Sequence, residues 1–174
     1  MPPTIAMAST VNIVLLRTVL AINLIYEHRK MNPRQKSCAL LADEHTRCIE
    51  GVRGLLEAEF DTIFTVADPG SLMEGTDRLQ PAVIIVDLPL AKGDLAGLIR
   101  QLRRSSLLSK IIALTVHTEP NIVDAMLSAG AHGVVLKHRI ARDLLAAIDV
   151  VLEGDKFVTP DIRPDQRQIP TRSL

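Results

Sequence analysis

The chain has 174 residues, 47% of them hydrophobic and only four of them aromatic, which is enough for one domain with a mainly aliphatic core. Its formal net charge is zero and no segment is strongly basic, so we expect no direct binding to DNA. The two cysteines, Cys38 and Cys48, fall in a predicted strand and a predicted helix. They indicate reduced thiols in a reducing compartment, rather than a disulfide framework or a metal site.

Residues 1–36 form an N-terminal extension whose role the sequence leaves open. Residues 5–26 are mostly apolar, long enough to cross a membrane, and a basic stretch at 28–30 would then keep the rest of the chain in the cytoplasm. Polar residues interrupt this run at Asn12, Arg17 and Asn23. Three interpretations stay open: a non-native extension before a start at Met31, a docking helix, and a membrane anchor.

From residue 37 onward, apolar runs and helical patterns alternate. Short apolar runs predict five strands, at 38–42, 62–66, 82–87, 110–114 and 133–136. Helical spacing predicts a helix after each strand. The first follows Thr46 as its cap and has its apolar positions within 49–56, and the others lie at 69–79, 95–104, 119–129 and 140–153. Five such units predict a doubly wound α/β domain over 37–154, with helices on both faces of a parallel sheet. Residues 155–174 contain three prolines and many charges, which predict a flexible tail.

The notable polar residues follow the predicted strands. They are Asp43, Glu44, Asp87, Thr115 and Lys137. The carboxyl ends of parallel strands share one edge of the sheet, so we expect these side chains to converge there. Three carboxylates would repel one another without a hard cation, and Mg²⁺ prefers such oxygen ligands. With an ammonium and a hydroxyl beside them, this set predicts phosphoryl transfer to a carboxylate.

The residue types, their order and their separations of 43, 28 and 22 residues from Glu44 to Lys137 resemble the receiver domain of bacterial two-component response regulators. The resemblance implies a flavodoxin-like, five-stranded sheet with strand order 2-1-3-4-5. The segment Gly-Asp-Lys-Phe-Val-Thr-Pro at 154–160 is similar to the segment that follows the receiver in nitrate-response, LuxR-type regulators. A helix-turn-helix domain comes next in those proteins, and the fourteen residues after Pro160 lead us to expect none here.

The resemblance also implies a role for each site residue. Asp87 would accept a phosphoryl group from the phosphohistidine of a sensor histidine kinase or a phosphotransfer protein. Lys137 would pair with Asp87 and then with the phosphate, and Thr115 would move toward a phosphoryl oxygen. Mg²⁺ would be held by Asp43, Glu44, Asp87 and the main-chain carbonyl of Pro89. A downstream protein target, and a homodimer, are the further partners that the resemblance suggests.

The chain departs from the family pattern at several positions. Val134 stands where the family usually has an aromatic switch residue, and His138 where a proline commonly follows the lysine. In the loop after Asp87 the usual proline position holds Ala91, and Val116 is bulkier than the residue often found after the Thr. We interpret His117, His132 and His138 as solvated or structural histidines, because none has the spacing of a metal-binding pair.

Three functions follow as expectations. The first is a single-domain, cytoplasmic receiver that signals by protein contacts and has no enzyme activity beyond self-phosphorylation and slow self-dephosphorylation. The second is a receiver-like interaction module that phosphate no longer switches. The third, a hydrolase with an Asp nucleophile, is disfavoured because Pro89 stands where its general acid would be.

Overall fold

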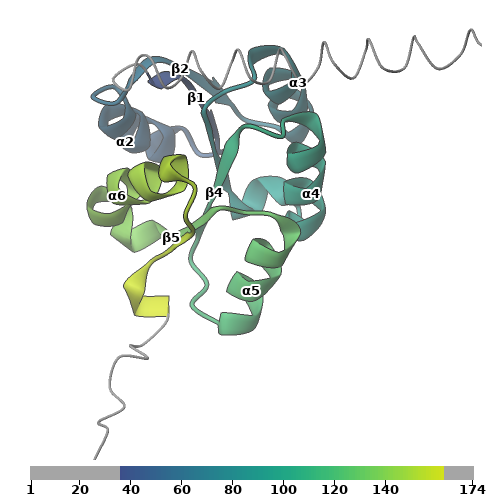
Figure 1. Ribbon diagram of the computed structural model, residues 1–174, viewed down its shortest axis with the longest axis vertical. Helices are drawn as coiled ribbons and strands as arrows, with labels where there is room; N and C mark the ends of the chain where they lie inside the picture. The colour runs from purple at the N-terminus through teal and green to yellow at the C-terminus, as the bar shows by residue number, and fades with distance from the viewer. Residues whose placement is uncertain (1–35, 163–174) are drawn as a thin grey trace, which may run out of the picture. The chain divides into compact units, whose positions relative to one another are not determined.

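A parallel sheet lies at the centre of residues 36–162, the part of the chain that the computed structural model describes (Figure 1). Within these residues the strand order is β2-β1-β3-β4-β5-β6. The strands are β1 (Lys36–Ala42), β2 (Phe60–Val66), β3 (Val83–Asp87), β4 (Lys110–Thr115), β5 (Gly133–Leu136) and β6 (Phe157–Val158). The order of the first five strands confirms the flavodoxin-like sheet predicted from the sequence.

Helices cover both faces of the sheet, as Figure 1 shows. One face carries α3 (Pro69–Leu79), α4 (Leu95–Ser105) and α5 (Pro120–Ala129), and the other carries α2 (Thr46–Leu56) and α6 (Ile140–Glu153). Short 3-10 helices follow at Leu88–Ala91, Lys137–Arg139 and Pro160–Ile162.

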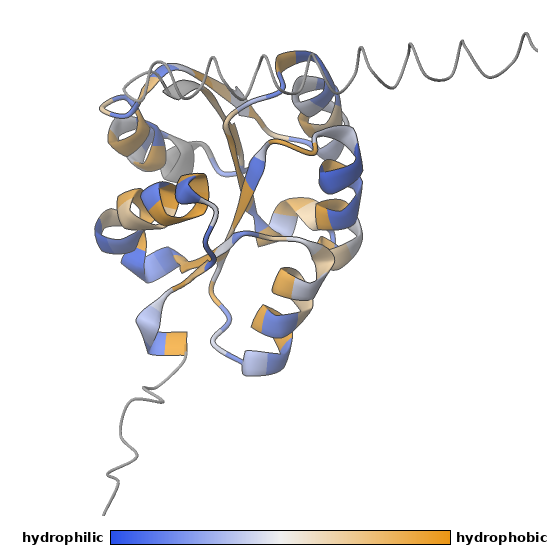
Figure 2. Ribbon diagram, viewed as in Figure 1, coloured by the Kyte–Doolittle hydropathy of each residue, from blue (hydrophilic) through white to orange (hydrophobic). Residues whose placement is uncertain are grey.

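Strand β3 shows why the core forms two layers. Its side chains alternate between the faces: Ile84 and Val86 pack with α3, α4 and α5, whereas Val83 and Ile85 pack with α2 and α6. Every residue of β3 is buried, which explains the unbroken apolar run in the sequence. Figure 2 shows the same pattern, with hydrophobic strands between helices that have polar outer faces.

Capping residues fix where several helices begin and end. The carboxylate of Asp68 accepts a hydrogen bond from Ser71 N (2.9 Å) at the start of α3, and that of Asp94 accepts one from Gly97 N (2.8 Å) at the start of α4. Helices α5 and α6 end at glycines in the left-handed region, as C-terminal caps commonly do. The expectation for α2 was wrong: its N-cap residue is His45, and Thr46 is the first helical residue.

The sixth strand, β6, was not predicted. Phe157 N donates to His132 O (3.0 Å) and Thr159 N donates to Val134 O (3.0 Å), so this segment extends the sheet beyond β5. The prediction of a flexible tail from residue 155 was wrong for these residues, because a strand of two residues is too short to show a period in the sequence. Residues 157–162 instead have regular structure in β6 and the 3-10 helix after it.

The N-terminal extension assigned to residues 1–36 lies almost wholly outside the described residues, and so do its alternatives. Among the helices that the structure does describe, none combines the length and the apolar character that crossing a membrane requires.

Candidate functional site

Strand pairing brings the predicted site residues to one edge of the sheet. Ala42 in β1 pairs with Val86 in β3, so the residues that follow them, Asp43 and Asp87, come at the same level. On the other side of β3, Thr115 at the end of β4 pairs with Leu136 in β5, and Lys137 follows directly. The topology therefore explains why residues so far apart in the sequence converge.

Asp87 is fully buried, and its two carboxylate oxygens differ in their hydrogen bonding. Its Oδ2 accepts a hydrogen bond from Lys137 Nζ, which also forms an ion pair with it. Its Oδ1 is buried and has no hydrogen-bond partner. Burial raises the pKa of Asp87, the hydrogen bond from Lys137 opposes that rise, and the negative charge of Asp43 adds to it. One oxygen is thus neutralised by an ammonium, and the other has no partner.

Asp43 is 1% exposed, and it also has one hydrogen-bonded and one unpartnered carboxylate oxygen. Its Oδ1 accepts a hydrogen bond from His45 N (2.7 Å) and lies 3.3 Å from His45 Nδ1. Its Oδ2 is buried and has no hydrogen-bond partner. Buried carboxylate oxygens without partners are costly, so Asp43 and Asp87 together mark a place where a cation fits.

The structure does not bring Glu44 to this place. Glu44 is exposed, and its carboxylate is not among the donor atoms that converge there. Donor atoms of Asp43, His45 and Asp87 instead lie within 4.8 Å of one another. His45 was not among the predicted site residues, and no sequence pattern marks it: it lies next to Asp43 because the chain bends at Glu44 and His45 N donates to Asp43 Oδ1 (2.7 Å).

Thr115 is fully buried, and its hydroxyl oxygen accepts a hydrogen bond from His117 N (2.9 Å). The ring of His117 lies 3.4 Å from Glu119 Oε2, measured from its Nδ1. His117 also lines a cavity beside Asp87, so its side chain lies next to the site.

A cavity of about 280 Å³ opens beside Asp87. It is lined by Asp87, Leu88, Pro89, Gly93, Leu95, Val116, His117 and Lys137. The carbonyl oxygen of Pro89 accepts a hydrogen bond from Lys92 N (2.9 Å), which uses one of its two lone pairs. Its part in holding a cation therefore stays a prediction.

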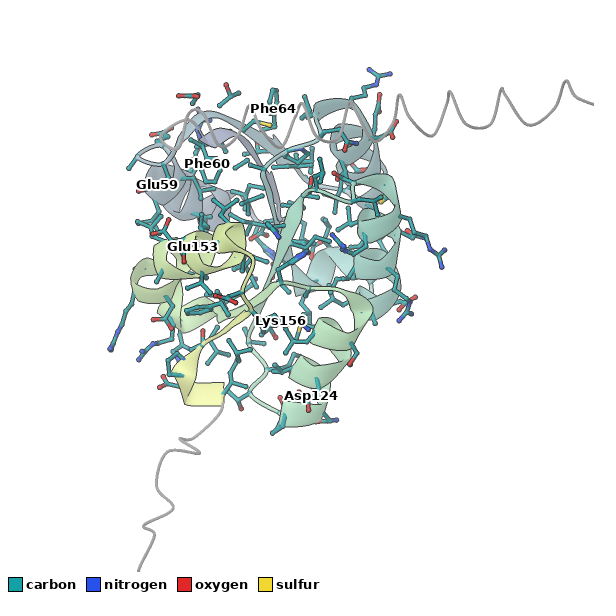
Figure 3. All side chains as sticks on the ribbon, in the orientation of Figure 1. Glu59, Phe60, Phe64, Asp124, Glu153 and Lys156 are labelled. Carbon is teal, nitrogen blue, oxygen red and sulfur yellow. The ribbon has the colours of Figure 1, made fainter. Side chains whose placement is uncertain are left out.

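A second, larger cleft of about 630 Å³ lies between α5 and β6. Asp124 from α5 and Lys156 from the segment before β6 both line it, and Figure 3 labels them. None of the site residues lines this cleft. The chemistry at Asp87 therefore belongs to the smaller cavity.

Residues 39–149 match the family model of the response regulator receiver domain, and the chain belongs to this family. It is 35% identical over 133 residues to the nitrate/nitrite response regulator protein NarP of Escherichia coli, covering 74% of this chain and 61% of NarP. It is 28% identical over 125 residues to the transcriptional regulatory protein DegU of Brevibacillus brevis, covering 71% of this chain and 53% of DegU. The chain thus spans little more than half the length of these curated relatives.

Solved structures of receiver domains have the same fold. The non-phosphorylated receiver domain of the stress response regulator RcsB from Escherichia coli superposes with a TM-score of 0.65 at 29% identity, over 71% of this chain and 98% of that one. The isolated receiver domain of RcsB from Salmonella enterica serovar Typhimurium, solved with the phosphomimetic BeF3-, also has a TM-score of 0.65, at 26% identity. It covers 73% of this chain and 96% of that one. Both confirm the receiver fold predicted from the strand-end residues.

Proposed function

We propose that this receiver accepts a phosphoryl group on Asp87 in a Mg²⁺-dependent reaction with the phosphohistidine of a sensor histidine kinase or a phosphotransfer protein. The observation that carries the proposal is the state of the Asp87 carboxylate: buried, paired with Lys137 through Oδ2, and without a partner at Oδ1. The neighbouring cavity gives a phosphoryl group access to it.

The reaction is a transfer of one phosphoryl group. A carboxylate oxygen of Asp87 forms a bond to phosphorus, the bond from phosphorus to the donor imidazole breaks, and the imidazole nitrogen keeps the electron pair and takes up a proton. A bound Mg²⁺ would supply positive charge for the phosphoryl oxygens. Lys137 supplies a second positive charge at the same place, because its ammonium already lies against Asp87. We infer that Thr115 donates its hydroxyl hydrogen to a phosphoryl oxygen.

Incubation with acetyl phosphate tests this directly. In the presence of Mg²⁺, intact-mass analysis should show one added phosphoryl group, lost on treatment with hydroxylamine because the product is an acyl phosphate. Asp87→Asn should abolish the addition, whereas the matched surface variant Asp77→Asn should keep it. A wild-type protein that takes no phosphoryl group from acetyl phosphate or from any kinase of its host would refute the proposal.

We further propose that the receiver works in the cytoplasm and passes its signal to a downstream protein by contact, with no enzyme activity beyond self-phosphorylation and slow self-dephosphorylation. A homodimer is a second contact of interest, since a solved structure of the relative RcsB shows two RcsB dimers bound to two DNAs. Light scattering before and after treatment with acetyl phosphate tests the dimer: a mass that stays monomeric in both states contradicts it.

One observation favours a second candidate, an interaction module that phosphate does not switch. Val134 replaces the usual aromatic switch residue, is fully buried, and has its carbonyl bonded to Thr159 N. Such a module would bind its target equally well before and after phosphorylation. Binding that changes on phosphorylation would exclude it.

A further inference from the structure

The edge of the sheet at β2 is a long strand that the proposed function does not use. Within the described residues, β2 pairs with β1 and ends the sheet on that side, and Figure 3 labels Phe60 and Phe64 on it. The strand at the opposite edge, β6, has only two residues, whereas β2 has seven. The outward backbone groups of a long edge strand are a template for pairing with another strand.

The composition of β2 favours pairing at this edge. Five consecutive residues, Thr62 to Val66, are β-branched or aromatic, the types that strands favour. Natural proteins often protect an edge strand with lysine or proline, and β2 contains neither. Its single charge, Asp61, lies near one end of the strand. Antiparallel pairing of two copies about the central residue Ile63 would place Asp61 opposite Thr65, so like charges would not meet.

An apolar groove of about 270 Å³ lies beside this strand, between β2 and α3. Leu40, Val66 and Leu79 line it together with Phe64, a large hydrophobic side chain that is 39% exposed. Gly75 of α3 also lines the groove, and a Cβ added to it would lie 3.3 Å from Leu40 Cδ2. Because α3 has no side chain at this position, the space beside Phe64 stays open.

Two charged residues of α3 line the same groove and complement each other across a two-fold axis. Glu74 and Arg78 lie one helical turn apart and form an ion pair (3.0 Å), with side chains 60% and 75% exposed. In a two-fold dimer through β2 the two α3 helices run antiparallel, so Glu74 of each copy faces Arg78 of the other. Helix α3 packs on β1, and neighbouring strands are about 4.8 Å apart, so the two helices would lie about 14 Å apart, within reach of these long side chains.

We propose that two copies of this chain associate by antiparallel pairing of their β2 strands about a two-fold axis at Ile63. Phe64 of each copy packs against Thr62 of the other on the α3 face of the sheet, which removes this exposed ring from water. Glu74 and Arg78 form reciprocal ion pairs between the two α3 helices. The inference goes beyond the proposed function, because β2 and α3 carry none of the site residues and the pairing requires no phosphoryl group.

Analytical ultracentrifugation of the full chain over a series of concentrations, without a phosphodonor, tests the dimer. The wild type should show a monomer–dimer equilibrium. Phe64→Lys places a charge on the edge strand and should raise the dissociation constant about tenfold or more. The matched control Leu107→Lys changes a hydrophobic residue that is 69% exposed and lies outside this edge, and it should stay within about twofold of the wild type. Circular dichroism checks that each variant is folded.

A mixing experiment tests the two-fold arrangement with changes on the exposed surface alone. Glu74→Arg and Arg78→Glu each bring like charges together across the axis and should weaken the homodimer about fivefold. An equimolar mixture of the two variants should dimerise more tightly than either variant alone, because each charge then faces its opposite. The ion pair within one helix cannot produce this recovery, since it stays broken in both chains.

Three results would each overturn the inference: an unphosphorylated wild type that is monomeric at every concentration, an unchanged dissociation constant in Phe64→Lys, or a mixture that dimerises no better than its components. A dimer that forms only after treatment with acetyl phosphate belongs to the first of these. The proposed function is tested separately, because phosphorylation of Asp87 is measured by mass and does not depend on β2. A protein that is phosphorylated but monomeric loses only this inference, and a dimer that takes no phosphoryl group loses only the proposed function.

Discussion

Repulsion between Asp43 and Asp87 should make the metal-free protein less stable than a variant that lacks one of these charges. Ligand oxygens of the two residues lie within 4.8 Å, and two unit charges at that distance repel by about 3–4 kcal/mol at an effective dielectric constant of about 20. Asp43→Asn removes this repulsion and keeps an oxygen that can accept the hydrogen bond from His45 N. Lys137 already screens Asp87, and the new amide NH₂ would be buried without a partner, so we expect a net gain of about 1–2 kcal/mol.

Urea unfolding followed by circular dichroism at pH 8 measures this gain, since the chain has no tryptophan for a fluorescence assay. In EDTA, Asp43→Asn should have a higher free energy of unfolding than the wild type. Mg²⁺ at ten times its dissociation constant should stabilise the wild type by about 1.4 kcal/mol and the variant much less. The control Asp77→Asn, an exposed change on α3, should stay within about 0.5 kcal/mol of the wild type. An Asp43→Asn protein that is less stable than the wild type in EDTA would refute the electrostatic reasoning.

Three further predictions concern other parts of the described chain. His132 Nδ1 accepts a hydrogen bond from Ile111 N (3.0 Å), and burial with nearby positive charge lowers the pKa of His132 to about 4 from 6.5. Between these two pH values the folded state therefore binds fewer protons than the unfolded state. About 2–3 kcal/mol of the free energy of unfolding present above pH 6.5 should be lost as the pH falls toward 4. In parallel urea titrations, the free energy of unfolding of His132→Gln should fall by less over the same pH range. Pro89 lines the cavity without a polar side-chain group that could orient water, so the phosphorylated protein should be long-lived. Pro89→Asn should shorten the half-life of the phosphorylated protein several-fold, as followed on a phosphate-affinity gel. Rapid loss of the phosphoryl group from the wild type, at a rate that Pro89→Asn leaves unchanged, contradicts this. Thr159→Val removes the hydroxyl that accepts from Leu136 N (3.1 Å) and should lower the free energy of unfolding by about 1–3 kcal/mol, whereas an unchanged value would show that the bond contributes little.

The fold was predictable because its strands and helices are strongly periodic and the site residues follow the strands directly. The run from Val83 to Asp87 is buried throughout, and its register with β1 and β4 places Asp87 beside Asp43 and Leu114. Parallel pairing then brings Thr115 and Lys137 to the same edge without any information about side-chain contacts.

The details that the sequence did not reveal depend on side-chain direction and on short segments. Which of Glu44 and His45 faces Asp87 depends on the backbone after β1, where no periodic pattern extends. Strand β6 has two residues and is held by backbone hydrogen bonds to His132 and Val134. No local sequence pattern predicts these hydrogen bonds. His117 likewise became part of the site only through its distances to Thr115 and Glu119.

The sixth strand changes how a signal would leave Asp87. Val134, at the position of the usual aromatic switch residue, is buried, and its carbonyl accepts a hydrogen bond from Thr159 N, so the segment at 157–159 pairs directly with the strand that carries this position. Thr159 also accepts a hydrogen bond from Leu136 N, one residue before Lys137, and Arg139 forms an ion pair with Asp161 (3.1 Å). A movement of Lys137 toward a phosphoryl oxygen would therefore also affect residues 157–162, since these contacts join that segment to both sides of the lysine.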